Sequence, residues 1–191
     1  MHNRKNEIGI RFKLYRFFSK INCLILRTVK HKNLKKMALQ VGKKAPNFKL
    51  FSSDKKEVSL KDYKGKNLVI QFFPAAFTGV CTNQMCEMRD SLKRYESLNS
   101  EVIGVSVDSP FTLDKFKTEQ GLGFRLLSDF NKKMVKSYGV FRKTFVLGMA
   151  GVAERAAVVV DKKGIVRHVE ILANPGNLPD FKAMNEVLAT L

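Results

Sequence analysis

The sequence contains few cysteines and no long apolar segment. Three cysteines in 191 residues are too few for a secreted disulfide scaffold, and their odd number leaves at least one thiol unpaired. No apolar run approaches the roughly 18 residues that a membrane span needs, because Lys or Arg interrupts every hydrophobic stretch. Five prolines and twelve glycines exclude collagen-like and low-complexity architecture. The expected class is therefore a soluble domain in a reducing compartment.

Several catalytic and cofactor motifs are also missing. The sequence has no Cys-x-x-Cys pair of a disulfide reductase, no Gly-x-Ser-x-Gly elbow of a hydrolase and no glycine-rich phosphate loop. A zinc site would need a second ligand pair besides Cys81 and Cys86, and the histidines at 2, 31 and 168 are scattered. We therefore expect neither a metal nor an organic cofactor.

Positive charge is what the sequence has in excess. It contains 35 Lys and Arg against 17 Asp and Glu, a net charge of +18 that suggests nucleic acid or an acidic membrane surface as a partner. Residues 1–36 hold eleven basic residues and one acidic residue, so this short segment carries more than half of the excess. We therefore predict a basic extension, residues 1–36, before a domain of residues 37–191, and no specific nucleic-acid binding.

The extension has the pattern of a basic amphipathic helix. Lys13, Arg16 and Lys20 fall on one face of a helical wheel, and Leu14 and Ile21 fall on the other. Such a helix can contact an anionic membrane surface or direct a protein to the mitochondrial matrix. The alternative is a start at residue 37, with the preceding residues an upstream extension and the cysteine at 23 a bystander. We expect a cytoplasmic protein, or a matrix protein if residues 1–36 are a transit peptide.

Short apolar runs and amphipathic segments alternate along residues 37–191. Strands are predicted at residues 67–73, 101–107, 124–128, 155–160 and 165–171, and helices at 82–98, 110–121, 132–138 and 178–191. A small hairpin is predicted near 48–59, and Asp161-Lys-Lys-Gly164 is a turn signal between the last two strands. This order predicts an α/β fold with a central mixed sheet between helices and an N-terminal hairpin.

Cys81 is the candidate nucleophile. It follows the strand at 67–73 and lies in the first turn of the next helix, where unpaired N–H groups and a partial positive charge favour a thiolate over a thiol. Ligands of open α/β sheets bind beyond the carboxyl ends of the strands. Pro74 stiffens the loop that leads to Cys81, and Thr78 brings a hydroxyl near the sulfur. The alternative is that Cys81 is simply a buried apolar side chain.

The segment Pro74-x-x-x-Thr78-x-x-Cys81 resembles the signature of the peroxiredoxins, and FFPAAFTGVCTNQMCEMRDSL is similar to the bacterioferritin comigratory protein branch of that family. The resemblance covers about residues 38–191. It implies a thioredoxin-like three-layer sandwich that reduces hydrogen peroxide and organic hydroperoxides. It further implies that Cys81 is oxidised to a sulfenic acid, that Thr78 orients the peroxide, that Pro74 shields the sulfur and that Arg155 stabilises the developing charge.

Cys86 matches the resolving cysteine found in part of that branch. An intact helix would separate two side chains five residues apart by about 140°, with Cα atoms about 8–9 Å apart, whereas a disulfide needs a Cα separation below about 7 Å. The first helical turns must therefore unwind for Cys81 and Cys86 to pair. The resemblance implies recycling by a thioredoxin-like dithiol and a monomer or homodimer. A one-cysteine peroxidase resolved by an external thiol and a thioredoxin-fold disulfide oxidoreductase remain alternatives.

Overall fold

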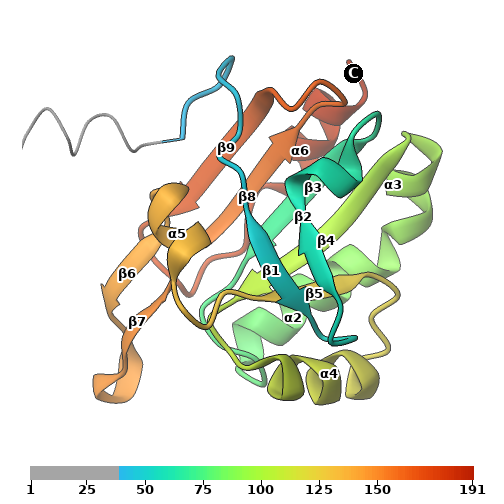
Figure 1. Cartoon of the computed structure of the whole chain (residues 1–191). Coiled ribbons are helices and arrows are strands. Elements are labelled where there is room, and N and C mark those ends of the chain that lie inside the picture. Colours follow the sequence, from blue (N-terminus) through green and yellow to red (C-terminus); the bar gives the residue numbers. More distant parts are fainter. Residues whose placement is uncertain (1–38) are drawn as a thin grey trace, which may run out of the picture. The chain divides into compact units, whose positions relative to one another are not determined.

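The computed structural model describes residues 39–191 (Figure 1). The predicted extension at residues 1–36, the alternative start at residue 37 and the cysteine at 23 therefore lie outside the described residues. Between residues 39 and 191, no helix combines the length and the apolar character that crossing a membrane requires.

Seven strands form one mixed sheet in the order β2-β1-β5-β4-β3-β8-β9. Their bounds are β1 Lys49–Ser52, β2 Glu57–Ser59, β3 Asn67–Phe72, β4 Ser100–Ser106, β5 Arg125–Ser128, β8 Arg155–Val160 and β9 Val166–Leu172. The strands β3, β4 and β5 are parallel, while β8 runs antiparallel to β3 and β1 runs antiparallel to β5. The predicted α/β fold with a mixed sheet and an N-terminal hairpin is confirmed.

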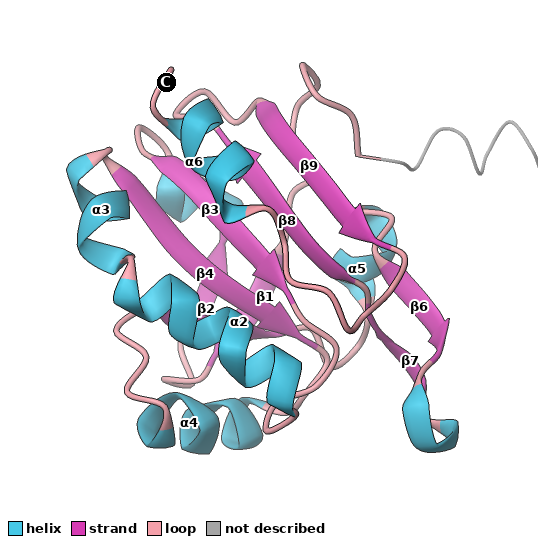
Figure 2. Cartoon of the chain, turned by 180° about the vertical axis from the view of Figure 1, so that it is seen from behind, coloured by secondary structure: helices cyan, strands magenta, loops and turns pink. Residues whose placement is uncertain are grey.

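Helices cover both faces of this sheet. The helices on the face seen in Figure 2 are α2 Gly79–Asp90, α3 Leu92–Ser97, α4 Pro110–Glu119 and α6 Phe181–Leu188. The other face packs against α5 (Lys133–Ser137) and the segment that leads into the N-terminal hairpin. Because β3 and β8 lie between these layers, every one of their residues is buried, which explains why they read as nearly continuous apolar runs.

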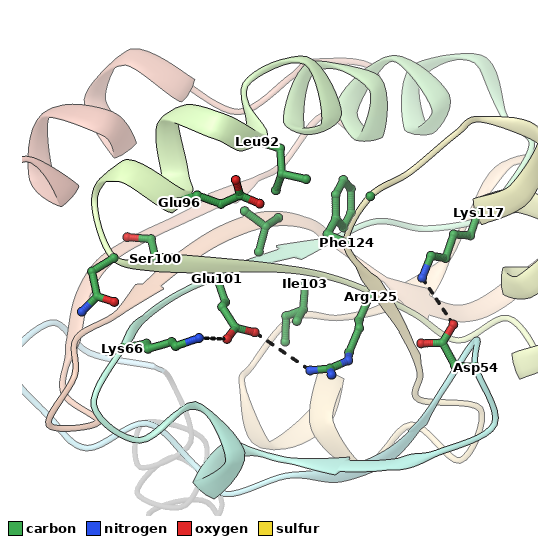
Figure 3. A pocket seen from close by; sticks show the side chains of 13 residues that line it. Asp54, Lys66, Leu92, Glu96, Ser100, Glu101, Ile103, Lys117, Phe124 and Arg125 are labelled. Atoms are coloured by element: carbon green, nitrogen blue, oxygen red, sulfur yellow. Dashed lines mark hydrogen bonds and ion pairs between the residues drawn. The ribbon is translucent and has the colours of Figure 1, made fainter.

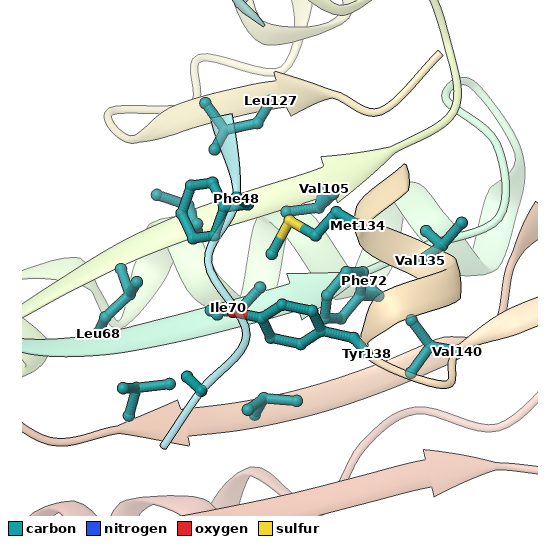
Figure 4. Close-up of a cluster of buried hydrophobic side chains, with 14 of the residues drawn as sticks. Phe48, Leu68, Ile70, Phe72, Val105, Leu127, Met134, Val135, Tyr138 and Val140 are labelled. Carbon is teal, nitrogen blue, oxygen red and sulfur yellow. The ribbon is translucent and has the colours of Figure 1, made fainter. Parts of the chain in front are cut away.

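The sheet divides the core into two clusters of apolar side chains. On the α5 face, the rings of Phe72 and Tyr138 lie 5.5 Å apart, with Ile70 and Met134 beside them (Figure 4). The Tyr138 hydroxyl donates to the Pro46 carbonyl at 2.8 Å, and burial raises the pKa of this phenol. The cluster on the opposite face contains Cys81 together with side chains from α2, α4 and α6. The candidate nucleophile is therefore built into the core.

Three elements differ from the sequence prediction by three residues or more. The last helix, predicted at 178–191, is shorter and spans Phe181–Leu188. The helix predicted at 82–98 begins earlier, at Gly79, and is divided at Ser91, whose ψ of 3° lies outside the helical range. The apolar spacing continues across this break, so the periodicity alone gives no sign of it. The hairpin of β6 (Phe141–Thr144) and β7 (Ala150–Ala153) was not predicted. Its strands have four residues each, and only the end of β7 is buried, which leaves no clear alternation to recognise.

The close packing at Gly104 generates a test of the core. A Cβ at Gly104 in β4 would lie 2.6 Å from Leu126 Cδ2 and 3.1 Å from Met85 Sδ. Because overpacking a core costs about 1–3 kcal/mol, Gly104→Ala should lower the urea concentration at the midpoint of unfolding. Gly79→Ala is the control, since no heavy atom lies within 4 Å of its added Cβ. Equal midpoints for Gly104→Ala and the parent protein would contradict this packing.

Candidate active site

The loop between β3 and α2 carries three of the predicted site residues. Pro74 is buried two positions after β3 ends. Thr78 occupies the N-cap position of α2 with an extended backbone, and its hydroxyl donates to the Ala75 carbonyl at 3.0 Å. Cys81 lies in the first turn of α2 and has no exposed surface. The structure therefore places Cys81 where the sequence predicted it, at a helix start beyond the carboxyl end of a buried strand.

This loop is held in place by contacts with the neighbouring strand ends. The Ala76 amide donates to Asp108 Oδ2 at 2.8 Å, and Asp108 lies just after β4. Ser128, at the end of β5, donates from its hydroxyl to the Asp108 carbonyl at 2.6 Å. Phe77 has a left-handed φ of 63°, and its ring packs edge-on against Phe116 of α4 with centroids 5.1 Å apart. Because a non-glycine residue adopts this φ only when its surroundings enforce it, these contacts fix the loop geometry.

Arg155 brings a buried positive charge to the sulfur. It is the first residue of β8, which pairs antiparallel with β3 so that Ala156 lies opposite Phe72. Its side chain is only 1% exposed, and Nη2 lies 3.4 Å from Cys81 Sγ. Its Nε donates to the Pro175 carbonyl at 3.0 Å. The pairing of β8 with β3 thus unites two site residues that lie 74 positions apart in the sequence.

Two glutamines complete the environment of Arg155. Gln84 Oε1 accepts a hydrogen bond from Arg155 Nη1 at 2.6 Å. The Gln84 amide nitrogen donates to Gln71 Oε1 at 2.8 Å and contacts the Phe72 carbonyl at 3.4 Å. Sequence reasoning missed both residues, although each left a signal. Gln71 is a polar residue within a buried apolar strand, and Gln84 lies one helical turn after Cys81 on the buried face of α2.

Cys86 is not brought next to Cys81. Both cysteines are free thiols in one continuous helix, whose geometry puts their Cα atoms about 8–9 Å apart. Cys86 is half-buried, and its sulfur lies 3.9 Å from Gln120 Oε1 at the end of α4. The Arg89 guanidinium donates to the Gln120 carbonyl at 2.8 Å. The pKa of Arg89 is raised by hydrogen bonding to Asp90 and by the neighbouring Cys86 thiol. Any pairing of the two cysteines thus requires movement of α2.

A cavity elsewhere in the molecule is lined by none of the predicted site residues. It has a volume of about 510 Å³ and includes the start of β4, whereas Cys81 follows the carboxyl end of the adjacent parallel strand. Lys66 and Arg125 both pair with Glu101 in it, and Lys117 pairs with Asp54 (Figure 3). These charges already satisfy one another. Among residues 39–191, no group of three or more His, Cys, Asp or Glu side chains is arranged to hold a metal ion.

Comparisons with known proteins identify the family. Residues 41–169 match the model of the AhpC/TSA family. Alkyl hydroperoxide reductase E of Mycobacterium tuberculosis is 38% identical over 156 residues, which cover 80% of this chain and 98% of that protein. Peroxiredoxin Bcp of Bacillus subtilis is 37% identical over 130 residues, which cover 67% of this chain and 82% of that protein.

Solved structures agree with this assignment. A peroxiredoxin-like protein from Aquifex aeolicus superimposes with a TM-score of 0.72 at 25% identity, covering 80% of this chain and 88% of that one. A reduced 2-Cys peroxiredoxin of Plasmodium vivax gives a TM-score of 0.68 at 30% identity, covering 78% of this chain and 80% of that one. The thioredoxin-like fold implied by the resemblance is confirmed. The chain belongs to the AhpC/TSA family and is a peroxiredoxin, as the segment from Pro74 to Cys81 indicated.

Proposed function

We propose that this thiol-dependent peroxidase uses Cys81 to reduce hydrogen peroxide and organic hydroperoxides. The observation that carries the proposal is the Arg155 guanidinium 3.4 Å from Cys81 Sγ, in a site that excludes water. A positive charge at this distance stabilises the thiolate and the negative charge that develops on the peroxide oxygens. The start of α2 adds a second electropositive group.

The first step transfers two electrons from sulfur to oxygen. The Cys81 thiolate attacks one peroxide oxygen, so that an S–O bond forms while the O–O bond breaks. The departing oxygen takes up one proton and leaves as water or an alcohol. Cys81 is left as a sulfenic acid.

Thr78 and Pro74 shape the approach to the sulfur in this proposal. The Thr78 hydroxyl lies three residues before Cys81 and supplies a polar contact for the peroxide, while buried Pro74 excludes water without adding an N–H donor. Cys81 itself is fully buried. Because the sulfur is enclosed, we expect small, unhindered hydroperoxides to react faster than bulky ones.

The second step joins Cys81 to Cys86. After the first turns of α2 unwind, the Cys86 thiol attacks the sulfenic sulfur, an S–S bond forms and water leaves. Helix ends open at low free-energy cost, and Cys86 is already half-buried rather than enclosed. A thioredoxin-like dithiol then reduces the disulfide by thiol exchange and restores both thiols.

Cys81→Ser tests the identity of the nucleophile. The variant should lose peroxidase turnover, because a serine hydroxyl is not ionised at neutral pH and cannot attack the O–O bond. Peroxide consumption coupled to a thioredoxin system measures the loss. Cys86→Ser is the matched control for the first step, since it removes the other thiol of the same helix and should still form one sulfenic acid per chain. Residual turnover in Cys81→Ser would refute the assignment.

Arg155 is tested by its effect on the pH dependence. Arg155→Ala should slow oxidation of Cys81 by about 10²- to 10³-fold at neutral pH. The loss should shrink as the pH rises, because alkaline pH favours thiolates whether or not a positive charge lies nearby. The second-order rate constant with hydrogen peroxide, measured from pH 5 to 9, checks this. Arg155→Lys keeps the positive charge but lacks the planar guanidinium that contacts Gln84 and Cys81 through two different nitrogens. It therefore separates the effect of the charge from the effect of the hydrogen-bond geometry. An unshifted pH–rate profile in Arg155→Ala would contradict the role.

Cys86→Ser tests the resolving step. The first oxidation should proceed at the parent rate, whereas the Cys81–Cys86 disulfide should be absent and thioredoxin-coupled turnover should fall sharply. Intact mass of the peroxide-treated protein, with and without alkylation, distinguishes the two products. Unchanged coupled turnover would instead favour a one-cysteine peroxidase that an external thiol resolves. Oxidation of Cys81 by peroxide no faster than that of free cysteine would favour a disulfide oxidoreductase.

A further inference from the structure

Gln71 is a buried polar side chain whose contacts end at the reactive sulfur. It lies in β3 with no exposed surface, and its amide nitrogen donates to Met184 Sδ of α6 at 3.3 Å. Its carbonyl oxygen accepts from Gln84, which in turn accepts from Arg155 beside Cys81. A continuous series of hydrogen bonds thus connects α6, through the sheet and α2, to the active site.

Gln71 supplies the shorter of the two acceptors that hold the Gln84 amide nitrogen, the other being the Phe72 carbonyl. A glutamine side chain donates through its nitrogen and accepts through its oxygen. Because Gln71 offers its oxygen at 2.8 Å, the Gln84 nitrogen faces the sheet, and the Gln84 oxygen is left to face Arg155 Nη1 at 2.6 Å. Removing the Gln71 acceptor leaves the Gln84 nitrogen with only the longer contact to the Phe72 carbonyl at 3.4 Å, so Gln84 is held less firmly against Arg155.

The same contact connects α2 to the sheet between the two cysteines. Gln84 lies between Cys81 and Cys86, so unwinding that segment withdraws Gln84 from Gln71 and from Arg155. The Gln71 oxygen and Arg155 Nη1 would each lose a hydrogen-bond partner in a buried site, which is unfavourable for an amide and more so for a charged guanidinium. The bond from Gln84 to Gln71 therefore favours the wound form of α2.

We propose that Gln71 is a positioning residue that promotes the oxidation of Cys81 and retards its pairing with Cys86. The second part rests on the resolving role proposed for Cys86. A slower resolution prolongs the life of the sulfenic acid, during which a second peroxide can oxidise it to a sulfinic acid. Gln71 thereby sets the balance between fast reaction with peroxide and resistance to overoxidation.

Gln71→Met tests this balance, because methionine has a similar shape but no carbonyl acceptor. Loss of one net hydrogen bond corresponds to about 3- to 10-fold in rate. The variant should react with peroxide about 3- to 10-fold more slowly and form the disulfide faster by a similar factor. Its sulfinic acid yield at fixed excess peroxide should fall. The chain contains no tryptophan, so quenched flow with thiol alkylation and intact mass provides the three readouts.

Val69→Ala is the matched control. Val69 lies on the same strand and the same face of the sheet as Gln71 and is equally buried, but it makes only apolar contacts. It should lower stability without moving the two rates in opposite directions. Gln84→Met and the double variant complete a double-mutant cycle. If both residues act through the same hydrogen bond, adding Gln71→Met to Gln84→Met should change the two rates little further. Gln71→Glu, which keeps an acceptor oxygen, should retain slow disulfide formation.

The outcomes separate the two proposals. The role of Gln71 would be overturned if Gln71→Met left the rates of Cys81 oxidation and of disulfide formation unchanged. It would also be overturned if Gln71→Met moved both rates in the same direction. Additive effects in the double variant would also overturn it. If the parent protein never forms the Cys81–Cys86 disulfide, the resolving role fails, while the oxidation rate of Gln71→Met in a Cys86→Ser background still tests the positioning of Arg155.

Discussion

A guanidinium with almost no exposed surface is the constraint around which this active site is arranged. Moving such a charge out of water is expensive unless charged or hydrogen-bonding groups surround it. Arg155 donates to Gln84 and to the Pro175 carbonyl, and its remaining contact is the Cys81 sulfur. No carboxylate accepts a hydrogen bond from it within residues 39–191. Within residues 39–191 the site therefore holds a positive charge without a carboxylate partner beside the Cys81 sulfur, and the proposed role of Cys81 rests on this contact.

The topology explains how residues so distant in sequence meet there. Parallel pairing of β3, β4 and β5 brings the loops after these strands to one edge, where Asp108 contacts both the active-site loop and the end of β5. The antiparallel strand β8 begins where β3 ends, and so it delivers Arg155 to the same edge. A parallel strand in that place would have put its first residue at the opposite edge. The antiparallel pairing of β8 with β3 is thus what places Arg155 beside Cys81.

Sequence reasoning reached the parts of this arrangement that local pattern specifies. The apolar run of β3 followed by a helix start predicts the location of Cys81, and the family resemblance adds Arg155. The division of the helix at Ser91 and the β6–β7 hairpin left no periodic signal. Gln71 and Gln84 were not predicted as site residues, for a different reason. Each polar residue was visible in a buried segment, but their partners depend on how α2 lies against β3, which no spacing along the chain records.

In the proposed mechanism, the two cysteines place opposing demands on one helix. Cys81 benefits from an intact α2, because the wound first turn supplies the unpaired amides and keeps Gln84 beside Arg155. Disulfide formation requires that same turn to open, since the wound helix holds the sulfurs on different sides. The two requirements cannot be met at the same moment, so oxidation must precede unwinding. Once Cys81 is a neutral sulfenic acid, its charge attraction to Arg155 is lost, and one of the interactions that favoured the wound helix disappears with it. In the proposed mechanism, the chemistry of the first step thereby lowers the free-energy cost of the second.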